Sequence, residues 1–193
     1  MKEISEEKIR VLIDLDGVLR NYVEGVIRVY RREYPQHRIL PVTSRRLEDF
    51  FPIGEKIYPF IGKKFYREVL EEAPPYPGAI ESMHARQRDF EMVLVTAQPP
   101  HWRYSTFIWI GKHRVPVNDI LIRREKHKET GVALLDDFVE NLEAFADTGR
   151  LAVCMDQPWN QEWPGPRAGT VDEFFDIVLE YLGSRPDEKV NFT

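Results

Sequence analysis

Short apolar segments alternate with longer amphipathic ones along most of the chain. The first apolar segment, 9–15, is rich in β-branched residues, and similar runs occupy 91–96, 132–135 and 151–155, with a weaker one at 119–122. Continuous apolar runs of this length are typical of strands buried on both faces of a parallel sheet. We therefore predict that these segments form one mostly parallel sheet.

The segments between these strands have the spacing of amphipathic helices. Apolar side chains recur every three or four residues over 17–34, which predicts one helix there. Further helices are predicted at 78–88, 102–113, 138–147 and 171–182, the last preceded by a capping-box sequence. Alternating strands and helices predict an α/β fold of the Rossmann-like kind, with a parallel sheet between two helical layers and right-handed crossovers.

One region interrupts the alternation. Residues 35–77 contain no strand and helix repeat, and six aromatic residues fall within 50–66. A proline-rich stretch at 74–78 then returns the chain to the sheet. We predict an insertion at 35–77 in a core domain made of 1–34 and 78–193.

Composition and charge narrow the class of protein. The 193-residue chain is 42% hydrophobic and carries a net charge of −5, which argues against binding polymeric nucleic acid through bulk electrostatics. Its longest apolar run, at 151–155, is far shorter than the roughly 20 residues of a membrane span, and residues 1–8 are too charged for a secretory signal. The single cysteine, Cys154, excludes a disulfide framework. We expect a cytoplasmic enzyme or binding domain for small molecules, with no membrane partner.

Two pairs of acidic residues follow predicted strands. Asp14 and Asp16 end the first, and Asp136 and Asp137 end the strand at 132–135. Carboxyl ends of parallel strands meet at one edge, where like charges about 4 Å apart repel by roughly 4 kcal/mol at an effective dielectric near 20. A divalent cation would relieve this repulsion, and all-oxygen ligands favour Mg²⁺ over Zn²⁺. Alternatively, Asp136 or Asp137 caps the helix that follows, and Asp16 belongs to an ordinary turn.

The order of these residues along the chain resembles a known arrangement. Asp14-Leu15-Asp16-Gly17 after the first strand, Thr96 after a later one, then Lys126 and finally Asp136-Asp137 resemble the four motifs of the haloacid dehalogenase superfamily. The resemblance extends over 9–156. It implies a haloacid dehalogenase-like fold in which the insertion at 35–77 is a small helical cap over the site.

The resemblance also implies catalytic roles. Asp14 would attack phosphorus and form an aspartyl-phosphate, and Asp16 would act as general acid and then as general base. Thr96 and the amide of Ala97 would hold the phosphate, while Lys126, or as an alternative Lys128, would neutralise charge. Mg²⁺ would be bound by Asp14, the backbone carbonyl of Asp16, and Asp137 or Asp136, with the choice between the last two left open.

A closer resemblance is to the 5'(3')-deoxyribonucleotidase branch. It rests on the small insertion, on a lysine ten residues before Asp136, and on the sequence Asp-Gln-Pro-Trp-Asn at 156–160. That branch hydrolyses nucleoside monophosphates and stacks the base on cap aromatics, so Phe50 and Phe51 are the candidates for this contact. Arg45 is the candidate polar contact, with Arg46 and Lys64 as alternatives.

Several alternatives stay open at the level of sequence. The aromatics of the insertion could instead form its own core. The segment 97–102 departs from the Thr-Ser-Pro pattern of the branch, which leaves the phosphate-binding loop and the preferred nucleotide open. Trp159 could flank the pocket or fasten its own loop. A sugar phosphatase and a nucleotide-binding protein without turnover are the competing functions, and a homodimer is also left open.

Overall fold

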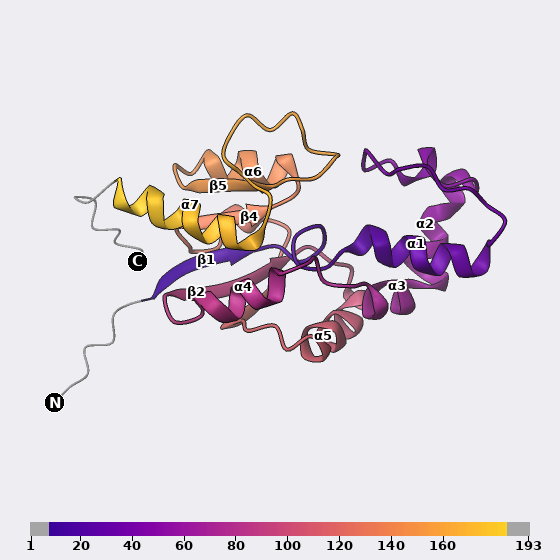
Figure 1. Cartoon of the computed structure of the whole chain (residues 1–193), viewed down its shortest axis with the longest axis horizontal. Helices are drawn as coiled ribbons and strands as arrows, with labels where there is room; N and C mark the ends of the chain where they lie inside the picture. Colours follow the sequence, from indigo (N-terminus) through magenta and orange to yellow (C-terminus); the bar gives the residue numbers. More distant parts are fainter. Residues whose placement is uncertain (1–7, 185–193) are drawn as a thin grey trace.

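A computed structural model describes residues 8–184; residues 1–7, which bear on the expectation about a secretory signal, lie outside that range. Six strands form one sheet, surrounded by helices (Figure 1). The strands are β1 Ile9–Ile13, β2 Phe90–Thr96, β3 Asp119–Ile122, β4 Ala133–Asp136, β5 Leu151–Met155 and β6 Arg167–Ala168. The α-helices are α1 Tyr22–Glu33, α2 Ile57–Pro59, α3 Tyr66–Glu72, α4 Ala79–Arg86, α5 Arg103–Lys112, α6 Val139–Ala146 and α7 Val171–Gly183.

The strands pair in the order β3-β2-β1-β4-β5-β6, and every pairing is parallel. Val11 of β1 lies between Met92 of β2 and Ala133 of β4, so the carboxyl ends of these three strands meet at one edge. The five predicted strands are confirmed. The sixth, β6, was not predicted, because two residues carry no hydrophobic pattern of their own.

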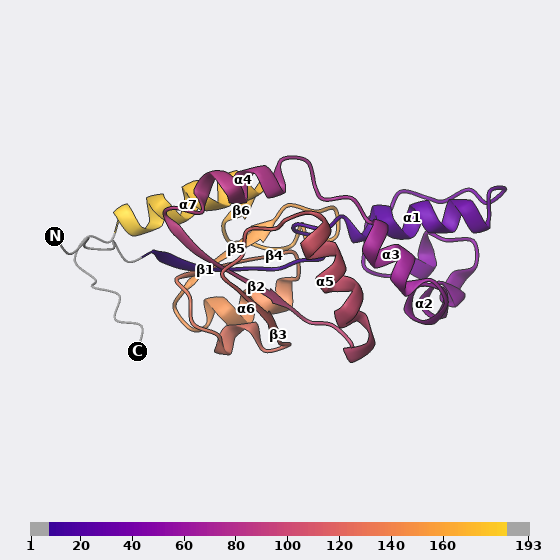
Figure 2. The same ribbon diagram turned by 90° about the horizontal axis from the view of Figure 1, so that it is seen from below.

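Alternate residues of the strands pack into different hydrophobic clusters. Val11 and Ile13 enter a cluster with Phe175 of α7, whereas Leu12 enters another with Phe145 of α6. Figure 2 shows the result, with α4 and α7 on one face of the sheet and α6 on the other. The expected three-layer α/β/α architecture is confirmed.

The apolar stripe over 17–34 is divided between two structures. Its first part is a turn in which Gly17 has a φ of 85°, and α1 begins only after Asn21, whose side chain accepts a hydrogen bond from the amide of Glu24 (3.0 Å). Leu19 packs in the cluster that contains Phe175 of α7, whereas Val26 packs in a separate cluster. The predicted helix start at residue 17 is wrong, since α1 starts at Tyr22. The apolar residues before α1 belong to one hydrophobic cluster and those within it to another, but together they have the spacing of a single helix.

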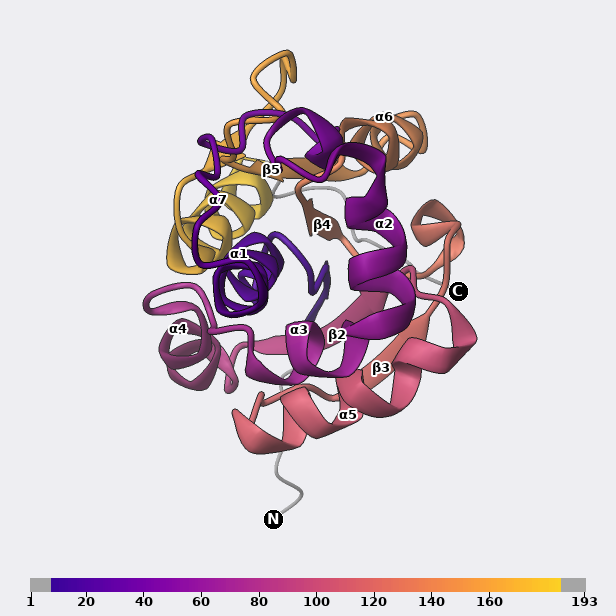
Figure 3. The ribbon, with the colours of Figure 1, turned by 90° about the vertical axis from the view of Figure 1, so that its right-hand side faces the viewer.

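That separate cluster holds the inserted region together. Tyr30 of α1 lies at its centre, with its ring 4.9 Å from that of Phe51 and 5.6 Å from that of Phe60. Figure 3 shows α1, α2 and α3 in front of the carboxyl ends of the central strands. Since α1 packs with the insertion, we propose that the cap comprises 21–73 instead of the expected 35–77.

Candidate active site

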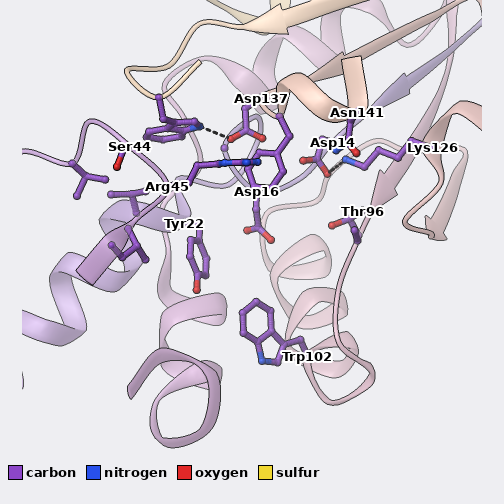
Figure 4. A pocket seen from close by; sticks show the side chains of 17 residues that line it. Asp14, Asp16, Tyr22, Ser44, Arg45, Thr96, Trp102, Lys126, Asp137 and Asn141 are labelled. Atoms are coloured by element: carbon purple, nitrogen blue, oxygen red, sulfur yellow. Dashed lines mark hydrogen bonds and ion pairs between the residues drawn. The ribbon is translucent and has the colours of Figure 1, made fainter. Parts of the chain in front are cut away.

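Carboxylates from two central strands meet around one ammonium group at the edge of the sheet. Asp14 directly follows β1, Asp136 ends β4, and Lys126 lies in the short helical turn η5, Lys126–Lys128. Lys126 Nζ is 2.7 Å from Asp14 Oδ1, as Figure 4 shows. The same nitrogen is 2.6 Å from Asp136 Oδ2. With Asp137, these carboxylates form a buried group in which one oxygen of each lies within 4.8 Å of the others.

The protein satisfies Asp136 completely. Besides Lys126, this carboxylate accepts hydrogen bonds from the amide of Phe138 (2.9 Å) and from Nδ2 of Asn141 (3.0 and 3.2 Å). Helix α6 begins after Phe138, which is its N-cap residue, and no side chain makes a capping hydrogen bond there, so the capping role considered from the sequence is not found for Asp136. Asp136 therefore orients Lys126, and its lone pairs are already used.

Asp137 is satisfied on one side only. Its Oδ2 accepts a hydrogen bond from Nε1 of Trp159 (2.9 Å), whereas its buried Oδ1 has no partner among residues 8–184. A buried oxygen without a partner is costly, and a divalent cation would satisfy it. The backbone leaves room only for glycine beside it, because a Cβ on Gly17 would lie 2.2 Å from Asp137 Oδ2. The acidic cluster can thus hold a metal ion, with Asp137 presenting the free ligand atom.

Burial and mutual repulsion shift the ionisation of this cluster. Burial raises the pKa of Asp14 to about 7, with Lys126 opposing the shift and Asp136 adding to it. Burial and the neighbouring carboxylates also raise the pKa of Asp137 well above its ordinary value. Burial lowers the pKa of Lys126, but the two carboxylates that it contacts outweigh burial and raise it overall. A dication would lower both carboxyl pKa values by favouring the ionised forms.

A cavity of about 280 Å³ opens above the cluster, between the cap and the sheet. Asp14, Lys126 and Asp137 line it, and Thr96 at the end of β2 lines it with Ala97. The remaining wall includes four aromatic side chains: Tyr22 of α1, Trp102, Phe138 and Trp159. The structure thus brings the residues of all four expected motifs to one cavity (Figure 4).

Asp16 also lines the cavity, but its carboxylate is held apart from the acidic cluster. It accepts hydrogen bonds from Nε and Nη2 of Arg20 (2.6 and 2.9 Å) and from Nε2 of Gln98 (3.0 Å). Figure 4 shows the Asp16 carboxylate turned away from those of Asp14 and Asp137. Arg20 and Gln98 were not predicted as partners of Asp16. Spacing offered a signal only for Arg20, four residues after Asp16.

The sequence of the chain matches a known family of enzymes. The family model described as 5' nucleotidase, deoxy (pyrimidine), cytosolic type C matches residues 7–181. The chain belongs to this family.

Individual members of the 5' nucleotidase family are distant in sequence. The human cytosolic-type 5'(3')-deoxyribonucleotidase is 26% identical over 153 residues, which cover 67% of this chain and 70% of that enzyme. The mouse mitochondrial 5'(3')-deoxyribonucleotidase is 26% identical over 148 residues, covering 69% of this chain. The match covers 66% of the mouse enzyme's length.

Solved structures show the fold of this nucleotidase-family chain. A haloacid dehalogenase-like hydrolase from Streptococcus pneumoniae has a TM-score of 0.60 at 12% identity, covering 89% of this chain and 98% of that one. A haloacid dehalogenase superfamily hydrolase from Geobacter sulfurreducens has a TM-score of 0.58 at 12% identity, covering 89% of this chain and 96% of that one.

Within residues 8–184, no helix combines the length and apolar character needed to cross a lipid bilayer.

Some expected substrate contacts of this family member lie elsewhere. Phe51 is 2% exposed and packs in the cap core, and Phe50 packs against the same cluster, so neither lines the cavity. This corrects the expectation that they stack on a base, because the cap needs them for its own packing. Arg45 lines the cavity, but its guanidinium pairs with Glu140 and lies 4.4 Å from the ring of Phe138.

The alternative cationic candidates also have other partners. Lys128 pairs with Glu125 at the surface (2.6 Å), which leaves Lys126 as the lysine of the cluster. Arg46 pairs with Asp49 (3.1 Å), and Lys64 lies 4.4 Å from the ring of Phe65.

Proposed function

We propose that this protein is a Mg²⁺-dependent phosphomonoesterase that hydrolyses nucleoside monophosphates, with deoxyribonucleotides preferred. The observation that carries the proposal is the buried Asp14 carboxylate, held by Lys126 beside the unpartnered oxygen of Asp137, at the base of a cavity under a cap. The relatives named as deoxyribonucleotidases support the substrate class.

In this scheme Asp14 attacks phosphorus in line and the alkoxide leaves, giving an aspartyl-phosphate that water then hydrolyses. Asp16 donates a proton to the leaving oxygen and takes one from the attacking water. Thr96 and the amide of Ala97 bind phosphate oxygens. Lys126 lies against Asp14 and offsets the negative charge that gathers there during transfer.

The metal would be held by the carboxylates of Asp14 and Asp137 with the backbone carbonyl of Asp16. Asp136 is the less suitable direct ligand, because Lys126, Phe138 and Asn141 already use its oxygens. The cation would supply charge neutralisation between an anionic nucleophile and an anionic substrate. Oxygen ligands without histidine or cysteine favour Mg²⁺.

The cavity wall supports a substrate with a flat apolar part. The rings of Tyr22 and Trp102 lie with their centroids 6.1 Å apart. Trp159 also lines the cavity, and its indole nitrogen donates to Asp137. Aromatic rings bind nucleobases by stacking, at about 1–3 kcal/mol for each base. A small cap-covered cavity suits a mononucleotide better than a polymer. A cytoplasmic location and a homodimer stay predictions.

A panel assay tests the proposal. We expect the purified protein with Mg²⁺ to release phosphate from nucleoside monophosphates, deoxyribonucleotides above all, and to lose this activity in EDTA. Efficient turnover of sugar phosphates with none of nucleotides would overturn the substrate class. Nucleotide binding without release of phosphate from any monoester would overturn the enzymatic assignment.

A further inference from the structure

Arg20 is a fully buried arginine whose side chain ends on Asp16. It has 0% exposure, and its Nε and Nη2 bind the two oxygens of the Asp16 carboxylate at 2.6 and 2.9 Å. Two parallel bonds between a guanidinium and a carboxylate fix both distance and orientation. Burying an arginine is costly unless its charge is paired, so this pair constrains Asp16 strongly.

Arg20 lies in the first of the two linkers that join the sheet to the cap. Its backbone bridges both Asp16 and Pro75, so the two linkers run side by side at this point. Its side chain also reaches the carbonyl of Leu70 in α3 (3.4 Å) and the ring of Trp109 in α5 (5.6 Å). Arg20 therefore contacts the cap, the sheet domain and Asp16 at once.

Gln98 donates a third hydrogen bond to the same carboxylate. Thr106 donates from its hydroxyl to Oε1 of Gln98, which leaves Nε2 of Gln98 to donate to Asp16 at 3.0 Å. Thr106 is itself fully buried in α5. Gln98 lies in the segment 97–102 that departs from the expected motif, so one residue of this departing segment contacts Asp16.

We propose that Arg20 and Gln98 are positioning residues that fix the carboxylate of Asp16 for proton transfer. This inference rests on the proposed function, in which Asp16 serves the leaving and attacking oxygens. Proton transfer by a placed side chain contributes about 10²–10⁴-fold to rate, and small displacements of the group forfeit much of it. Arg20 also contacts Leu70 of α3 and pairs with Pro75. We therefore expect the position of the Asp16 carboxylate to depend on how the cap packs against the sheet domain.

Substrates with different leaving groups provide the test. A nucleoside leaves as a basic alkoxide that needs a proton, whereas p-nitrophenolate leaves without one. We expect Arg20→Met to lower kcat/KM for a deoxynucleoside monophosphate by about 10²-fold and that for p-nitrophenyl phosphate by less than a tenth of this factor. Gln98→Leu, which removes the third donor and keeps the buried arginine pair, should shift the same ratio by a smaller factor.

Two controls separate positioning from folding. Arg86→Met removes another arginine that binds two carboxylates, those of Asp172 and Asp176 on α7, and should leave the ratio of the two kcat/KM values unchanged. Arg20→Lys keeps the charge and should recover part of the activity towards the nucleotide. In an Asp16→Asn background, adding Arg20→Met should change kcat less than twofold, because the group to be placed is gone.

The outcomes are distinct. Equal losses on both substrates in Arg20→Met and Gln98→Leu, or full additivity with Asp16→Asn, would make Arg20 and Gln98 structural only and overturn the inference. If Arg20→Met does not fold, Arg20→Lys and Gln98→Leu decide by the same ratio. A wild-type protein that hydrolyses neither substrate overturns the proposed function. If the wild type is active and the variants keep its ratio of the two kcat/KM values, only the positioning role of Arg20 and Gln98 is overturned.

Discussion

Two adjacent carboxylates, Asp136 and Asp137, differ in how far the protein satisfies them. Asp136 accepts four hydrogen bonds from three partners, including Lys126, whereas one buried oxygen of Asp137 has none among the described residues. The difference follows from the turn after β4, which points one side chain at α6 and η5 and the other at the cavity. It gives each carboxylate a separate, testable property.

Replacing each carboxylate by its amide should separate these properties. Asp137→Asn should weaken Mg²⁺ binding at least tenfold and leave the free energy of unfolding of the metal-free protein equal or higher, because it removes a buried charge. Asp136→Asn should lower that free energy by about 2–4 kcal/mol, because it leaves Lys126 with one partner fewer. Calorimetric Mg²⁺ titration and urea unfolding measure the two effects. The reverse pattern would contradict our assignment of the metal ligand.

At the scale of single residues, the sequence predicts which residues at strand ends meet in the site. It does not predict residues that only hold another side chain in position. Asp14, Thr96 and Asp136 could be placed because parallel strands end at one edge. Arg20 and Gln98 could not, because their partner is set by how two linkers and α5 pack. Phe51 was misassigned because an aromatic side chain in a small cap serves packing or binding equally well from its sequence alone.

Helix α7 shows how an element is stabilised by its first turn. Thr170 accepts a hydrogen bond from the amide of Glu173 (3.2 Å), and Glu173 accepts one from the amide of Gly169 (2.6 Å). The predicted capping box thus forms, with the return bond one residue earlier than in the usual pattern. Phe174 and Phe175 follow directly and are fully buried against the sheet.

Removing this cap should weaken the fold and spare the chemistry. Thr170→Ala should lower the free energy of unfolding by about 1 kcal/mol, which corresponds to about 2–4 °C in Tm, because the Glu173 amide loses its partner. Thermal unfolding measures the shift, and kcat should stay the same because α7 contributes nothing to the cavity. An unchanged Tm would show that the cap does not limit the stability of this helix.

Element boundaries are where sequence patterns fail in this chain. The stripe over 17–34 has helical spacing throughout, yet its first residues belong to the sheet core and its later ones to the cap. The spacing of apolar residues indicates that their side chains are buried, but it does not indicate in which of the two hydrophobic clusters they pack. The glycine at position 17 was the available signal, since its positive φ ends the strand segment in a turn.

At the scale of the whole molecule, the sheet and the proposed cap share a cavity lined by three carboxylates, those of Asp14, Asp16 and Asp137. Asp14 has a pKa near 3.8 in the unfolded chain and about 7 in the folded, metal-free protein. Between these values the folded state holds a proton that the unfolded state has released. The free energy of unfolding of the metal-free protein should therefore fall as pH rises from about 4 to 7.

A bound cation should reverse this loss, because it stabilises the ionised carboxylates. We expect saturating Mg²⁺ to raise Tm more at about pH 8 than at about pH 5, where protons compete for the same oxygens. Differential scanning fluorimetry across this range measures the effect. The Asp14→Asn variant, which lacks one of the two carboxyl groups with a raised pKa, should show a flatter pH dependence without metal. A larger Mg²⁺ shift at acidic pH would contradict the linkage.

The central claim is that Asp14 carries the phosphoryl group during turnover. Rapid mixing with a ³²P-labelled deoxynucleoside monophosphate and Mg²⁺, acid quenching and peptide mapping test it directly. We predict label on the peptide that contains Asp14, formed at a rate no slower than kcat and absent from Asp14→Asn. Phosphate release without any labelled protein, together with undiminished turnover by Asp14→Asn, would contradict the account.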